Sequence, residues 1–257
     1  IEGAIATAPD GIEKARLLSR AGMIRVFLGD FEPGFAALSA AEEHARAAGD
    51  SRLVAECSQI RGLACYRQAE YDRALEELGR ALVLYTDAGE SHRAAAIESN
   101  IGLIHLDRGD LSAAEERFRA SLKLFHRVGL RRGEAVNLLN LGLVESESGR
   151  YERALQSMLS ALEIRRELGD RRAEGADLGN LGAVWLRAGQ PERATAALER
   201  AVVLAKEMDN RQSESANQSR LGEVELARGH PERALGRFEK GLDLAPRAGL
   251  PAQAVPA

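Results

Sequence analysis

The sequence predicts an all-α protein, a solenoid of six helical hairpins that each span 40 residues. Three columns of small residues support this prediction, because each column recurs every 40 residues without a change of register. The columns are Gly22, Gly62, Gly102, Gly142, Gly182 and Gly222; Gly34, Ala74, Ala114, Ala154, Ala194 and Ala234; and Ala41, Ala81, Ser121, Ala161, Ala201 and Gly241. A fixed period of this length is typical of stacked repeats.

Each repeat contains two segments whose apolar residues follow helical spacing. In the fourth repeat, Leu138, Leu141 and Val144 mark the first segment, and Leu155 and Met158 mark the second. Apolar residues three or four positions apart form one face of a helix. Each repeat is therefore predicted to be a pair of antiparallel helices.

Glycine marks the break between the two helices of most repeats. A glycine in the left-handed conformation ends a helix at little cost. The second repeat has Ala69 at this position, which predicts a small local strain. Pro191 and Pro231 open the last two second helices, and proline suits the first helical turn. The break glycines are Gly29, Gly109, Gly149, Gly189 and Gly229.

The predicted repeats comprise residues 10–49, 50–89, 90–129, 130–169, 170–209 and 210–248. Most of them begin with a residue that can cap a helix N-terminus, namely Asp10, Asp50, Glu90, Asp170 and Asn210. Residues 1–9 are predicted to be a flexible lead-in, and residues 249–257 a flexible tail or linker. The first repeat departs most from the pattern, with Arg16 and Arg20 on the less charged face of its first helix, and we interpret it as a partly capping unit.

The spacing resembles the tetratricopeptide repeat. That repeat has small residues at the eighth, twentieth and twenty-seventh positions of a helical hairpin, and the fourth repeat places Gly142, Ala154 and Ala161 there. The 40-residue length is similar to that of the Pins/LGN polarity scaffolds, kinesin light chain and many bacterial signalling and transcription regulators. The resemblance covers residues 10–248. It implies a right-handed α-solenoid of about twelve antiparallel helices with a concave groove that binds a protein or peptide partner.

The composition excludes several classes of protein. Hydrophobic residues make up 45% and charged residues 29%, which is ordinary for a soluble protein. The net charge of −4 comes from interspersed charges, so we expect neither nucleic acid nor a membrane as partner. No signal-peptide pattern and no apolar run of about 18 residues is seen, so a cytoplasmic location is predicted. Arginine strongly outnumbers lysine, which suits a GC-rich bacterial genome.

The residues that most often carry catalysis are scattered. Cys57 and Cys65 are eight residues apart in one predicted helix, about 12 Å, which is too far for a disulfide. The histidines fall in different repeats and form no metal-ligand cluster or nucleophile–base pair. We therefore expect no enzyme, no cofactor and no metal site. The histidines are His44, His92, His105, His126 and His230.

A column of asparagines is the first candidate site. A helical wheel places Asn100, Asn140 and Asn180 on the side of the first helices that faces away from the core. A carboxamide both donates and accepts, so it can pair with the backbone of an extended peptide. The resemblance to the Pins/LGN and kinesin light chain groups implies this role. The alternative is that each asparagine bonds a neighbouring repeat or solvent.

Apolar and basic residues surround this column. Leu103, Val136 and Leu143 would supply pockets for side chains of a ligand, unless they pack against the adjacent hairpin. Arg132 and Arg172 lie one turn from predicted helix N-termini, where a positive charge opposes the helix dipole. They would meet acidic residues of a ligand, or would pair with a carboxylate such as Glu167 or Glu174. Arg187 is predicted on the same face.

Three functions fit this pattern. The first is a non-catalytic scaffold that binds an extended peptide in the concave groove. The second is a sensory or regulatory module of a larger bacterial signalling or transcription-regulator protein. The third is self-association through the ends of the array into a homo-oligomer, in which Leu250 docks on the first helix of another copy.

Overall fold

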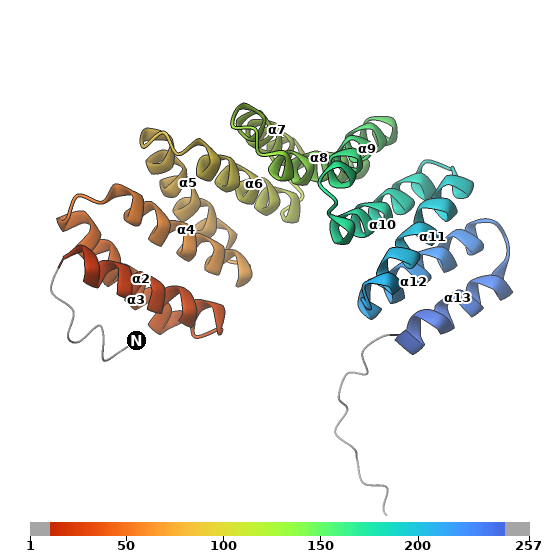
Figure 1. Cartoon of the computed structure of the whole chain (residues 1–257), viewed down its shortest axis with the longest axis horizontal. Coiled ribbons are helices and arrows are strands. Elements are labelled where there is room, and N and C mark those ends of the chain that lie inside the picture. The colour runs from red at the N-terminus through yellow and green to blue at the C-terminus, as the bar shows by residue number, and fades with distance from the viewer. Residues whose placement is uncertain (1–10, 245–257) are drawn as a thin grey trace, which may run out of the picture. The chain divides into compact units, whose positions relative to one another are not determined.

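The computed structural model describes residues 11–244, and within these residues the chain forms twelve α-helices and no strand (Figure 1). The prediction of an all-α fold is confirmed. The helices are α2 (Ile12–Phe27), α3 (Phe31–Ala47), α4 (Ser51–Arg67), α5 (Tyr71–Asp87), α6 (Ser91–Asp107), α7 (Leu111–Arg127), α8 (Arg131–Glu147), α9 (Tyr151–Glu167), α10 (Arg171–Arg187), α11 (Pro191–Glu207), α12 (Arg211–Ala227) and α13 (Pro231–Leu244).

The helices pack as successive hairpins in two compact units, unit 1 up to residue 137 and unit 2 from residue 138, and the division falls within α8. In unit 1, α2 packs on α3, α4 on α5 and α6 on α7, and in unit 2 α10 packs on α11 and α12 on α13. The first helices of successive hairpins also contact one another, α2 with α4 and α4 with α6 in unit 1, and α10 with α12 in unit 2. This is the packing of an α-solenoid built from helical hairpins.

The turns within the hairpins adopt the predicted left-handed conformation. Gly149 has a φ of 73°, and the four other break glycines have similar values. Ala69 takes the same conformation with a φ of 58°, although it carries a Cβ. The amides after α4 close this turn, because the N–H of Ala69 donates to Tyr66 O (2.9 Å) and the N–H of Glu70 donates to Cys65 O (2.9 Å). This pattern is a Schellman motif.

The columns of small residues lie where helices touch. A Cβ added to Gly142 would lie 2.4 Å from Cγ of Met158, and one added to Gly182 would lie 2.5 Å from Cγ of Leu198. Ala154 is fully buried in the facing helix. Glycine therefore recurs every 40 residues because the two helices of each hairpin contact one another at this position and leave no room for a methyl group.

Three of the predicted caps are formed. Asp50 Oδ1 accepts from the N–H of Leu53 (2.9 Å), Asp170 Oδ1 from Ala173 (3.2 Å) and Asn210 Oδ1 from Ser213 (3.0 Å). These bonds satisfy backbone donors that a helix leaves open at its start. The side chain of Glu90 makes no such cap bond. Asp10, the predicted lead-in and the predicted tail, including Leu250, lie outside the described residues.

Cys57 and Cys65 are both buried free thiols, and burial raises the pKa of Cys57 to about 11. None of the helices α2–α13 is both long enough and apolar enough to span a bilayer.

Candidate functional site

The first helices of unit 1 form a cavity of about 390 Å³. All of its lining residues come from α2, α4 and α6, so no second helix of a hairpin contributes to it. Two apolar side chains on α2 are strongly exposed at its edge, Met23 at 46% and Phe27 at 77%. The lining residues are Met23, Val26, Phe27, Glu56, Gln59, Ile60, Leu63, Ala64, Arg67 and Arg93.

Two arginines in this cavity are held by local contacts. Nη1 of Arg67 donates to Val26 O (3.2 Å), and the guanidinium lies 5.7 Å from the ring centroid of Phe31. Nη1 of Arg93 donates to the hydroxyl of Tyr85 (3.3 Å). The guanidinium carbon of Arg93 lies 5.4 Å from the centroid of the Tyr85 ring. Contacts between guanidinium groups and aromatic faces stabilise both positions. The cavity therefore combines an apolar floor with fixed positive charges.

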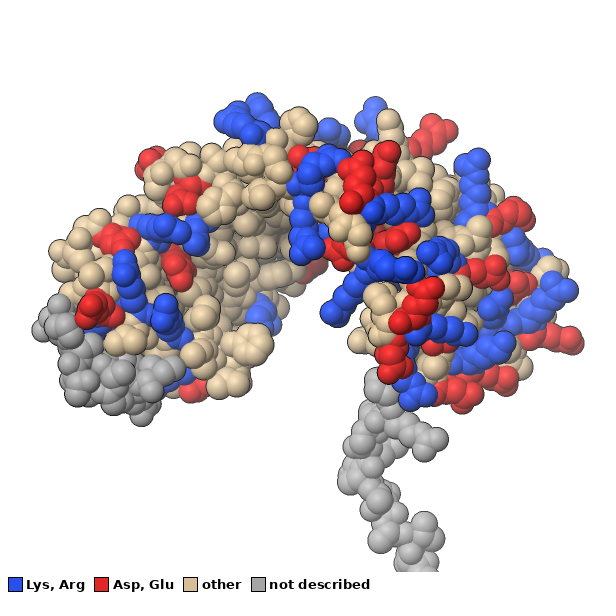
Figure 2. Space-filling view, viewed as in Figure 1, with Lys and Arg blue, Asp and Glu red and all other residues tan. Residues whose placement is uncertain are grey.

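A smaller, polar cavity of about 250 Å³ lies beside the first one, and Glu56 lines both. Arg16 and Arg20 reach it from α2, about two turns and one turn before Met23 respectively. Asp50 and Arg52 reach it from the start of α4. We call these two cavities together the unit 1 groove. Figure 2 shows a larger uncharged area over unit 1 than over unit 2, where positive and negative side chains are interspersed.

The asparagine column is divided between the units. Asn100 lies on α6 of unit 1, whereas Asn140 and Asn180 lie on α8 and α10 within unit 2. The side chains of Asn100 and Asn180 are partly exposed. Asn140 is only 8% exposed, so little of its amide meets solvent. The helical wheel assigns the same orientation to equivalent residues of every repeat, so it does not predict the burial of Asn140.

The chain matches the family model of the tetratricopeptide repeat over residues 93–167 and again over residues 134–207. The chain contains tetratricopeptide repeats. Among curated proteins, none matches the sequence.

Several solved structures share this tetratricopeptide fold. BtubC from P. vanneervenii is 20% identical with a TM-score of 0.69, and the match covers 95% of this chain and 90% of BtubC. A STAND signal-transduction ATPase from Pyrococcus horikoshii with a tetratricopeptide repeat sensor is 15% identical with a TM-score of 0.82, and the match covers 94% of this chain and 37% of that one. A Rap protein complexed with Competence and Sporulation Factor is 15% identical with a TM-score of 0.68, covering 94% and 78% of the two chains.

The predicted leucine and valine pockets of the tetratricopeptide array differ in their environment. Leu143 packs against the buried cluster that contains Met158 and Leu181, so part of its surface belongs to the core of unit 2. Val136 is exposed, and Leu103 is partly exposed. The alternative of packing against the adjacent hairpin thus describes Leu143 best.

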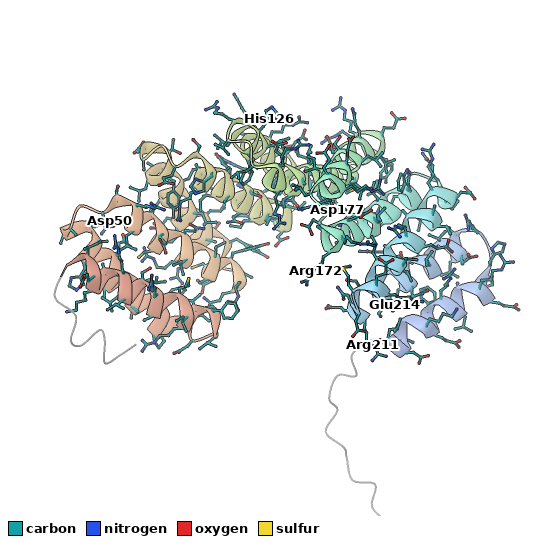
Figure 3. All side chains as sticks on the ribbon, viewed as in Figure 1. Asp50, His126, Arg172, Asp177, Arg211 and Glu214 are labelled. Carbon is teal, nitrogen blue, oxygen red and sulfur yellow. The ribbon has the colours of Figure 1, made fainter. Side chains whose placement is uncertain are left out.

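The three predicted arginines also differ. Nη1 of Arg187 donates to Glu147 Oε1 (2.6 Å), and this bond raises the pKa of Arg187. Arg132 is exposed. Arg172 projects from the start of α10 (Figure 3) and lines a cavity of about 400 Å³ between α10, α11 and α12. Glu174, the carboxylate considered as its partner, places its Oε1 3.0 Å from Nε of Arg166.

The unit 1 groove contains residues that we did not predict as site residues, above all Met23 and Phe27. By the period of 40 residues, Met23 is equivalent to Leu103 and Phe27 to Arg187, which are both on the predicted ligand face. The sequence does not single them out, because the first repeat departs from the pattern and a capping unit is not expected to bind a ligand. Within residues 11–244, His, Cys, Asp and Glu side chains form no group of three that could hold a metal ion.

Proposed function

We propose that this tetratricopeptide protein is a non-catalytic scaffold that binds an extended peptide segment of a partner protein along its first helices. One observation carries the proposal, the cavity of about 390 Å³ in unit 1 that only first helices line. Its volume lies in the range of ligand sites, about 300–1,000 Å³. Exposed apolar side chains beside such a cavity indicate an interaction surface. The proposal includes a cytoplasmic location, a protein or peptide partner and no nucleic acid, membrane or cofactor.

The predicted site residues have separate roles in this proposal. The partly exposed amides of Asn100 in unit 1 and of Asn180 in unit 2 would each pair with peptide backbone bound to its own unit, whereas Asn140 would contribute little because of its burial. Arg172 would meet an acidic residue at the cavity of unit 2. Leu103 and Val136 would contact apolar side chains. Arg187 would act only if a ligand displaced Glu147.

A peptide-display selection on the purified chain tests this function. Enriched peptides should bind in solution. Asn100→Ala should weaken the binding of peptides to unit 1, and Asn180→Ala that of peptides to unit 2, each about two- to thirteenfold, since one hydrogen bond contributes about 0.5–1.5 kcal/mol. Gln156→Ala is a matched control, because Gln156 is an exposed amide on the second helix α9. Failure to enrich any peptide over an unrelated helical protein would contradict the proposal.

A sensory or regulatory module is the second candidate function. It is supported by the likeness to the STAND ATPase, whose repeats are described as a sensor and of which this chain matches 37%. In this case the same reading frame should encode an ATPase, kinase or DNA-binding domain. Sequencing of the complete gene distinguishes this candidate from a free-standing scaffold.

A further inference from the structure

The unit 1 groove changes character along its length. Its polar end contains Arg16, Arg20 and Arg52, and its apolar end contains Met23 and Phe27. Glu56 lines both cavities, so the two ends are contiguous. A single extended ligand can therefore contact both ends.

The charge of the groove is opposite in sign to that of the whole protein. Five arginines and two carboxylates line it, although the net charge of the chain is −4. The carboxylate of Asp50 accepts a hydrogen bond from the N–H of Leu53, so its negative charge is partly compensated by the N-terminus of α4. Arg52 lies 3.6 Å from Glu90, but no hydrogen bond or ion pair joins Arg16 or Arg20 to another residue within 11–244. The polar end thus favours a negatively charged group.

At the apolar end of the groove, large apolar side chains remain exposed to solvent and could be buried by a ligand. Phe27 and Met23 are exposed although Val26, between them on α2, is buried in the cluster of Leu38 and Ala64. Covering a large apolar side chain contributes about 1.5–3 kcal/mol. A bulky apolar side chain from a ligand would gain this energy by lying on Met23, Phe27 and Leu63.

We propose that the unit 1 groove binds an extended segment of a partner protein in which a bulky apolar residue lies about three residues from an acidic one. Arg16 and Met23 are seven positions apart on α2, or about 10 Å at about 1.5 Å per residue. An extended peptide covers this distance in about three residues. This inference rests on the proposed function and names the class of peptide that the groove accepts.

The experiment uses defined peptides and the full chain. Ten-residue Gly/Ser peptides carry one Glu and one Phe at separations of one to six residues, in both orders, and their affinity is measured by fluorescence anisotropy. Affinity should peak at a separation of about three residues, by tenfold or more over the extremes. Amide chemical shifts of α2 and α4 should move on binding. A flat dependence on separation would overturn the inference.

Charge-reversal and polar variants locate the two ends. Arg20→Glu should lower affinity for the best peptide at least tenfold and should abolish the preference for Glu over Gln in the peptide. Arg200→Glu is its control, since Arg200 is an exposed arginine on α11 of unit 2. Phe27→Glu should remove the preference for Phe, whereas Val83→Glu, at an exposed apolar residue of α5, should not. These positions are exposed, so the variants are expected to fold.

The failures of the two proposals are distinguishable. If display selects peptides whose binding depends on Asn100 or Asn180 but not on Arg20 or Phe27, the scaffold function stands and this inference is wrong. If light scattering shows a dimer that Phe27→Glu dissociates, the occupant is a second copy of the chain and the inference is also wrong. If neither selected nor defined peptides bind, both proposals fail.

Discussion

Oδ2 of Asp177, which is labelled in Figure 3, lies 3.5 Å from Nε of Arg165. Both side chains are buried in unit 2. The contact joins α10 to α9, and Asp177 is only 1% exposed. A buried ion pair at this distance repays little of the desolvation of its two charges. Burial therefore raises the pKa of Asp177 to about 6, despite the opposing charge of Arg165.

This pKa predicts a pH-dependent stability. The folded state binds a proton more tightly than the unfolded state, so the contribution of Asp177 is fully present below about pH 4 and is lost as the pH rises to about 6. The loss is roughly 2–3 kcal/mol. Asp177→Asn should remove it, because Asn137 and Asn217 occupy the same position in the neighbouring repeats.

Urea unfolding between pH 4 and 7 measures this effect. The difference in free energy of unfolding between Asp177→Asn and the parent chain should grow with pH over this range. Asp87→Asn, an exposed position on α5, should give a constant difference. Equal pH profiles for the parent and Asp177→Asn would show that the carboxylate titrates normally.

Ala69→Gly should stabilise the protein. Ala69 has a φ of 58° in the turn after α4, where a Cβ is unfavourable by about 1–2 kcal/mol. Greater freedom of glycine in the unfolded chain reduces the gain, so an increase of about 0.5–1 kcal/mol is expected from urea unfolding. Gly149→Ala, at the equivalent turn with a φ of 73°, should change stability in the opposite direction. A decrease for both variants would contradict the strain at Ala69.

Gly142→Ala should destabilise unit 2. The new methyl would lie 2.4 Å from Cγ of Met158 and 3.0 Å from the carbonyl oxygen of Ala154, so two helices would have to separate. Overpacking of this kind costs about 1–3 kcal/mol. Gly79→Ala is the control, because nothing lies within 4 Å of its added Cβ and alanine favours a helix. Thermal unfolding should show opposite shifts in Tm for the two variants.

Arg61→Ala should destabilise unit 1 strongly. Nε of Arg61 donates to Glu77 Oε1 (2.9 Å), and the same buried guanidinium also contacts Glu42. Its removal leaves two partly desolvated carboxylates, which costs about 3–5 kcal/mol in buried pairs. Arg119→Ala breaks an exposed pair with Glu115 and should cost less than about 1 kcal/mol. If Arg61→Ala and Arg119→Ala lowered the free energy of unfolding equally in denaturant, the buried network would stabilise the protein no more than an exposed ion pair does.

The acid response of the same network follows from Glu42. Burial raises its pKa, but the hydrogen bond from Arg61 and the charges of Arg61, Arg46 and Arg80 outweigh burial and lower it. The stabilisation is present above the ordinary pKa of a glutamate and is lost as the pH falls through the lowered value. Glu42→Gln should therefore be less stable than the parent at neutral pH, and the difference should shrink in acid unfolding.

Much of the fold could be predicted because the repeat has a physical cause at each position. Gly142 and Ala154 recur where helices touch, and Gly149 recurs where the chain must turn with a positive φ. The cap at Asp50 also followed from residue type alone. Of the predicted site residues, Arg172 proved to line a cavity, whereas Arg187 is paired and Leu143 packs on the core.

The sequence by itself determined the helices, their turns and the helix contacts, since these depend on spacing within one repeat and on the conformations that glycine and proline allow. Only the tertiary structure decided which polar and apolar side chains remain open to a ligand. Asn140 is buried while Asn180 is not, and Phe27 is exposed beside Arg67. The exposure of a side chain depends on its contacts with neighbouring helices, whose residues are about 40 positions away in the sequence. The pattern of residues within one helix does not predict these contacts.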